Sequence, residues 1–191
     1  MTVQLNGTTE RSARSELRHP LAGARQASDT SLKNLPNALR ARLLYAAGLF
    51  GAVMGVLFII IQPVFGMETL TSRHAQMYQQ LGHWSSGAAV AIAWIAHMSV
   101  SVIYGFLSGI VVLRSTRLPI VALFTLVFSW LTTLLAPPAN AIIVQLVSFQ
   151  EINAGGLPGM NFSLDAKFML HLMFFAAIGA ALHAYRKHLS V

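Results

Sequence analysis

The sequence contains no cysteine, and this absence removes several kinds of chemistry. Disulfide bridges, thiolate metal sites, iron–sulfur clusters and cysteine nucleophiles all need a thiol. Charged residues are scarce too, at 10% of 191 residues, against roughly 25% in an ordinary soluble domain. No Asp or Glu falls inside the long apolar runs. These runs therefore offer no carboxylate for a hard-metal site or for proton-coupled transport.

Sequence motifs of common enzymes are missing as well. There is no nucleotide-binding glycine loop, no HExxH sequence and no recognisable pair of nucleophile and base. The sequence therefore predicts a protein that is not an enzyme.

Hydrophobic residues, in contrast, make up 55% of the chain. They gather in runs long enough to cross the hydrocarbon core of a bilayer, which takes about 20 helical residues. We expect an all-α, integral membrane four-helix bundle over residues 41–191. Its spans are predicted at about 43–65, 88–113, 118–136 and 167–185.

Residues 1–40 differ from the rest because they are polar and rich in Ser, Thr, Ala and Arg. Such a segment buries too little apolar surface to offset the entropy of ordering, so we predict a disordered, basic cytosolic tail. Its Arg and Ser content also resembles an organelle transit peptide, but Glu10, Glu16 and Asp29 argue against that reading. The expected role of the tail is attraction to anionic lipid.

Basic residues show how the chain is oriented. The segment up to Arg42, the turn at 114–119 and the C-terminal end hold all but two of the 13 Lys and Arg residues, and the two exceptions are Arg73 and Lys167. The positive-inside rule therefore predicts that both termini are cytosolic. The net charge of +7 is explained by topology and anionic lipid, and we expect no nucleic-acid partner.

Two segments outside the spans are harder to interpret. The connector at 68–86 is predicted to be partly helical, and a second helix starting at His83 would project beyond the membrane. After Pro137 and Pro138, which break or kink a helix, residues 139–149 are too few for another crossing. They are a kinked continuation, an interfacial helix or a re-entrant segment.

Small residues recur at every fourth position in two of the spans. His97, Ser101, Gly105 and Gly109 share one ridge of the second span, and Gly51 and Gly55 share a ridge of the first. Small residues let the backbones of membrane helices approach closely. We therefore expect these ridges to be helix-packing faces, and we expect His97 to point into the bundle.

His97 and His171 are predicted to lie within about 3 Å of the same membrane depth, counted from the basic end of each span. Three interpretations stay open: a structural, hydrogen-bonded pair, a pH-responsive pair, or ligands of one b-type heme in a membrane anchor or electron carrier. No cofactor is expected, except heme b under the third interpretation. His83 and His183 are weaker candidates. The spacing of His83 and His97 suits one helix face and suggests a second heme, but His171 and His183 do not match it in depth.

Several sequence features resemble the YagU-like family of bacterial inner-membrane proteins. They are GLFGAVMG in the first span, IAHMSVSVIYGFL in the second, LLAPP after the third, and LHLMFF followed by AYRK in the fourth. The resemblance implies four spans and a multi-pass protein of the bacterial inner membrane, and it matches His97 and His171 to histidines of the family. It implies no mechanism, because the activity of the family is not established. A small transporter or channel, acting as a homo-oligomer or with a membrane partner, is the remaining hypothesis.

Overall fold

The computed structural model describes residues 36–115 and 117–189. Within that part the chain is helical and has no strand. Its helices are α3 (Asn37–Ile61), α4 (Leu70–Gly82), α5 (Ser86–Arg114), α6 (Leu118–Val147) and α7 (Ala166–Leu189), with short 3-10 turns at Gln62–Phe65 and Ala154–Gly156. The prediction for residues 1–35 lies outside the described residues. Residues 37–40, which we had assigned to the tail, belong to α3.

Four of these helices are long and apolar enough to cross a membrane, over residues 37–65, 86–114, 118–147 and 166–188. Many large apolar side chains on them face outward, including Ile60, Ile95 and Leu126, each with at least half of its surface exposed. An apolar exterior of this extent suits lipid contact and not water. The prediction of an all-helical chain with four helices able to span a membrane is therefore confirmed for the described residues.

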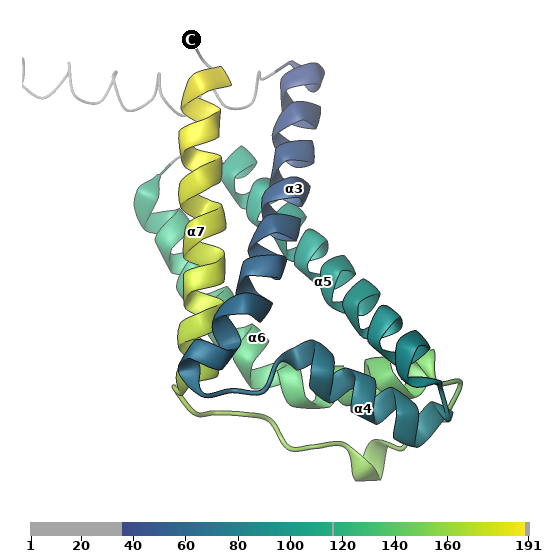
Figure 1. The fold of residues 1–191 in the computed structure, drawn as a ribbon. Helices are drawn as coiled ribbons and strands as arrows, with labels where there is room; N and C mark the ends of the chain where they lie inside the picture. Colours follow the sequence, from purple (N-terminus) through teal and green to yellow (C-terminus); the bar gives the residue numbers. More distant parts are fainter. Residues whose placement is uncertain (1–35, 116, 190–191) are drawn as a thin grey trace, which may run out of the picture. The chain divides into compact units, whose positions relative to one another are not determined.

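Helix α4 joins the ends of two long helices. Figure 1 shows α3 and α7 running side by side, α5 slanting away from α3, and α4 lying across between the end of α3 and the start of α5. Thr69 caps the start of α4, since its hydroxyl oxygen accepts from the Ser72 N–H at 3.3 Å. The Gln62 side chain also accepts from the Leu70 N–H at 2.7 Å, so that α4 is tied back to the end of α3.

The chain turns between α4 and α5 at His83. This residue adopts a left-handed conformation (φ 52°), and α5 begins only at Ser86. The expectation of one helix running from His83 was therefore wrong. His83 and His97 do not share a helix face, and the spacing argument for a second heme fails with it.

Helix α6 continues through Pro137 and Pro138 to Val147. A proline has no N–H, so Pro138 leaves the carbonyl of Leu134 without its usual helical donor. The backbone N–H of Asn161, in the connector to α7, donates to that carbonyl instead, at 3.0 Å. Residues 139–147 thus extend the third long helix, which is the first of the three alternatives considered.

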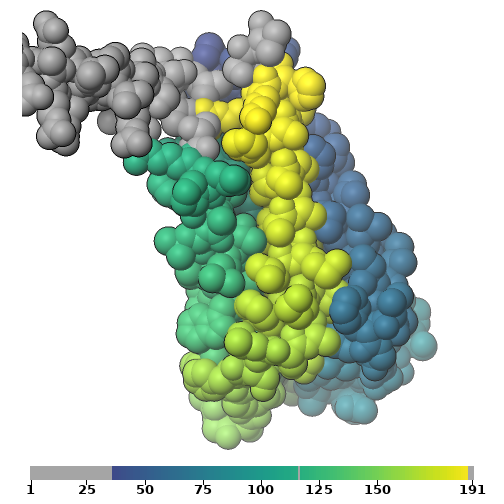
Figure 2. All heavy atoms as spheres, turned by 90° about the vertical axis from the view of Figure 1, so that its left-hand side faces the viewer, coloured from purple at the N-terminus to yellow at the C-terminus, as the bar shows by residue number. Residues whose placement is uncertain are grey.

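The packed interior forms two clusters. The larger contains Leu43 and Phe58 of α3, Val112 of α5, and Phe175 and Ile178 of α7. Figure 2 shows α6 and α7 lying side by side along one face of the described residues. The smaller cluster joins α4 to the start of α5 and the end of α6, with members Ala75, Tyr78, Ala89, Ala93 and Val144.

Candidate functional site

Helices α3 and α5 cross with their backbones in contact. Gly51 and Gly105 meet at the crossing: a Cβ added at either glycine would lie 3.0 Å from the Cα of the other. On the same face a Cβ at Gly55 would meet Ser101, and one at Gly109 would meet Ala47. The small residues therefore set the distance between the two helices, because any side chain there would force them apart.

This close approach gives His97 its partner. The Nε2 atom of His97 lies 2.9 Å from the carbonyl oxygen of Gly55. A carbonyl only accepts hydrogen bonds, so the imidazole donates, and in its neutral form it keeps an unprotonated Nδ1. Gly55 makes the contact possible because a Cβ in its place would meet the side chain of Ser101 and hold α5, with His97, away from α3.

A residue of α6, Thr133, contacts the side chain of His171 on α7. The Nδ1 atom of His171 lies 3.0 Å from the hydroxyl oxygen of Thr133. That hydroxyl already donates its single proton to the carbonyl of Ser129, at 2.7 Å. With that proton directed at the closer Ser129 carbonyl, the imidazole donates to Thr133, and its neutral form keeps an unprotonated Nε2.

The structure brings both histidines to the wall of one cavity of about 440 Å³. The cavity lies among residues of α3, α4, α5, α6 and α7, and of the connector before α7. Its size is within the range of small-molecule sites. Much of its wall is aromatic, contributed by Phe58, Tyr104, Phe128 and Phe174.

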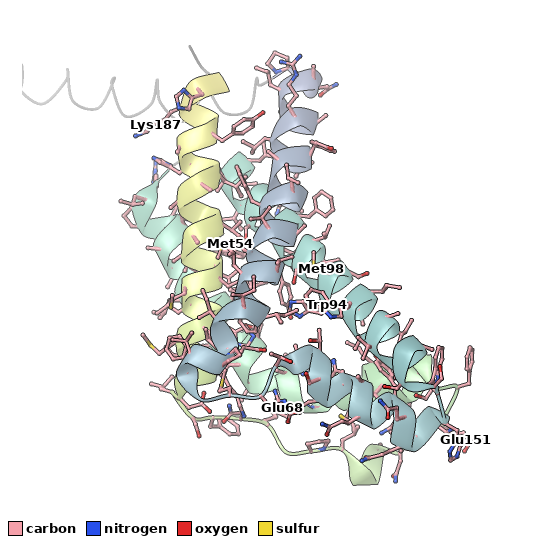
Figure 3. The ribbon with its side chains drawn as sticks, in the orientation of Figure 1. Met54, Glu68, Trp94, Met98, Glu151 and Lys187 are labelled. Carbon is pink, nitrogen blue, oxygen red and sulfur yellow. The ribbon has the colours of Figure 1, made fainter. Side chains whose placement is uncertain are left out.

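The two ends of the cavity differ in chemistry. Gln62, Arg73, Asn161 and Lys167 line the end where α3 stops and α7 starts. The aromatic residues of α7 and α5 lie further along the bundle. Arg73 and Lys167 are exposed, and none of the described residues that line the cavity is acidic. Figure 3 shows Glu68 near this end of the molecule and Lys187 at the opposite, basic end.

The hydroxyl-bearing residues of α6 serve mainly their own helix. Ser129 donates to the carbonyl of Thr125 at 2.6 Å, and Thr132 donates to that of Phe128 at 2.7 Å. Thr132 and Thr133 also line the cavity. Their hydroxyl protons are already engaged within the helix, so they offer oxygen lone pairs and not protons to anything inside it.

A heme held between His97 and His171 does not fit this arrangement. The ring of Phe58 packs against both imidazoles, with centroids 6.0 Å from His97 and 5.3 Å from His171. Two axial imidazoles would have to face each other across a porphyrin, in space that this ring shares.

The weaker candidates lie elsewhere. His83 is exposed in the turn after α4, and His183 is half-buried on α7. Neither lines the cavity.

Three buried polar atoms near the smaller cluster have no hydrogen-bond partner among the described residues. They are Nδ1 of His74, the hydroxyl of Tyr78 and the hydroxyl of Ser148. Burial, together with the charge of neighbouring Arg73, lowers the pKa of His74 from 6.5 to about 4. Burial also raises the pKa of Tyr78. His74 is therefore neutral in the folded protein near pH 7.

Sequence reasoning missed three features of this site: the ring of Phe58, the amide of Gln62 and the position of Arg73 and Lys167. The two cations had served only to orient the chain. Being the only basic residues at their end of the predicted bundle, they were the available signal of a charged cavity entrance.

No family model, curated protein or solved structure matches the chain. The resemblance to the YagU-like family stays a prediction.

Proposed function

We propose that this multi-pass protein of the bacterial inner membrane binds a small, largely apolar molecule between its helices, without catalysing a reaction on it. The observation that carries the proposal is the cavity with both histidines on its wall. A concave, mostly apolar site with a few fixed polar groups is typical of ligand binding. Predicted orientation places the charged end of the cavity on the outer side of the membrane.

The two histidines supply fixed hydrogen-bond acceptors. Each has its N–H committed to a protein oxygen, which orients the ring. Nδ1 of His97 and Nε2 of His171 then remain as lone pairs that a hydroxyl or N–H group of the ligand can use. This role needs no metal and accounts for both rings lining the same cavity.

The same lone pairs are the positions where a proton would add, so we expect ligand binding to depend on pH. Protonation would replace an acceptor by a donor and place positive charge in an apolar site. The charged and titratable groups around the pair are Arg73 and His74 from α4, Tyr104 from α5, Lys167 from α7, and Asp165 just before α7. Lowering the pH should therefore weaken the binding of ligands that donate to the histidines.

Native mass spectrometry of the gently solubilised protein tests the proposal. Leu131→Trp would fill the cavity, since Leu131 lines it. Leu126→Trp is the matched control, because Leu126 lies on the same helix, is 51% exposed and does not line the cavity. The natural sequence and L126W should carry the same bound molecule, and L131W should lose it. Equal retention by L131W, or no bound molecule on any of the three proteins, would contradict the proposal.

A further inference from the structure

The charged end of the cavity specifies what kind of molecule it receives. Resting on the binding role proposed above, we infer that the ligand is an amphipathic anion, with a carboxylate or phosphate group at Arg73 and Lys167 and an apolar body among the aromatic residues. Three observations support this inference: the charge at the entrance, the hydrogen-bonding groups beside it, and the nature of the remaining wall.

The two cations at the entrance are available to a ligand. Neither Arg73 nor Lys167 forms an ion pair or a side-chain hydrogen bond with another residue in the described ranges, 36–115 and 117–189. Neither of the carboxylates near this end pairs with these two cations. Asp165 accepts from the backbone N–H groups of Lys167 and Phe168 at the start of α7 and keeps its negative charge, which acts on His171, and Glu68 accepts from the side chain of Gln76.

An amide donor lies beside these cations. The Gln62 side chain is 3% exposed and lines the cavity. Its oxygen accepts from the Leu70 N–H at 2.7 Å. This bond orients the amide, and its NH₂ group forms no hydrogen bond with another described residue. The entrance thus combines three kinds of donor, and hydrogen bonds from charged donors to anionic oxygens are the strong ones.

The rest of the wall suits an apolar body. One turn beyond Lys167, His171 offers a neutral acceptor, and Phe58, Phe128 and Phe174 follow. An anion would be poorly placed among these groups, because unprotonated imidazole nitrogens and aromatic faces are both electron-rich. The charged group therefore belongs at the entrance and the apolar part inside. A cavity of about 440 Å³ is near the small end of ligand sites, which favours a single acyl or alkyl chain.

Binding of radiolabelled palmitate and of its neutral methyl ester, measured on the full chain in phosphatidylcholine nanodiscs, tests the inference. The double variant Arg73→Gln with Lys167→Gln removes both charges at exposed positions. Arg114→Gln is the matched control, since Arg114 is exposed at the far end of α5 and does not line the cavity. L131W reports whether binding occurs in the cavity at all.

We expect palmitate to bind the natural protein and R114Q alike, and the double variant at least about tenfold more weakly, the loss typical of one or two charged hydrogen bonds. The ester should bind weakly to all of them. Displacement of palmitate by phosphatidylglycerol, placed in the nanodisc, would identify a bilayer lipid as the source of the anion, and no displacement would identify a free acid.

Two results would overturn the inference. If the double variant binds palmitate as tightly as R114Q does, the cations do not recognise the anion. If the ester binds as tightly as the acid, charge is irrelevant. In either case loss of binding in L131W would leave the proposed binding role intact, whereas binding unaffected by L131W would remove that role too.

Discussion

Adding one methyl group at Gly105 should separate α3 from α5. An alanine Cβ there would lie against the carbonyl oxygen of Ala47 and 3.0 Å from the Cα of Gly51. Both neighbours are backbone atoms, which cannot rotate away as the end of a flexible side chain can. The two helices must therefore move apart along their whole crossing.

The expected cost has two parts. Overpacking a close-packed interface costs about 1–3 kcal/mol. The hydrogen bond from His97 to Gly55 spans the same crossing at 2.9 Å, and its loss adds about 0.5–1.5 kcal/mol. G105A should therefore lower the free energy of unfolding by about 1.5–4.5 kcal/mol.

Unfolding by sodium dodecyl sulfate in mixed micelles, followed by circular dichroism, measures this difference. Gly87→Ala is the matched control, because a Cβ on Gly87, also in α5, meets nothing within 4 Å. G87A should be as stable as the natural protein, or more stable by up to about 1 kcal/mol, from the helix propensity of alanine.

The coupling between His97 and the crossing can be tested in the same assay. His97→Leu removes this hydrogen bond and the ring contact with Phe58. Because G105A already disturbs the hydrogen bond, the two changes combined should cost less than the sum of the single changes. G105A as stable as G87A would refute the account of the crossing. Strict additivity would show that His97 does not depend on it.

Three further predictions concern other parts of the chain. The pKa of His74 is 6.5 in the unfolded chain and about 4 in the folded protein. The free energy of unfolding should therefore be highest above pH 6.5 and decline toward pH 4, by up to about 3 kcal/mol. In the unfolding assay, H74F should be less sensitive to pH between 4 and 6.5 than the natural protein. Pro138→Ala would return a helical donor to the Leu134 carbonyl and compete with the Asn161 N–H, so amide exchange in residues 157–164 should speed up, and unchanged exchange would count against this role for the proline. The dithionite-reduced protein should show no Soret, α or β band even when purified from heme-supplemented cells; a bis-histidine spectrum would contradict the hydrogen-bonded arrangement of the two imidazoles.

The sequence was informative wherever a regular helix relates position to face. The four apolar runs predicted the long helices, and the spacing of His97, Ser101, Gly105 and Gly109 placed them on one ridge, all of which is buried in the structure. Counting from the basic ends put His97 and His171 at one level, and both line one cavity. These inferences need only the number of residues per helical turn and the free-energy cost of placing a charged side chain in lipid.

Other features depend on contacts between distant segments. Gly55 as the partner of His97 had no sequence signal, because a backbone carbonyl is common to every residue. The continuation of α6 past Pro138 depends on a donor from Asn161, which local rules for proline do not include. His83 was misjudged because a helical spacing was extended across a turn where the chain adopts positive φ.

The most direct test of the central claim, a cavity open to ligands among apolar helices, uses the natural absence of cysteine. Ala136→Cys places a single thiol on the cavity wall, and Leu126→Cys places one on an exposed, apolar position of the same helix. We predict that a water-soluble methanethiosulfonate reagent modifies A136C in native membranes and leaves L126C unmodified, because only a thiol that meets water forms the reactive thiolate. Equal failure to react at both positions would contradict the claim.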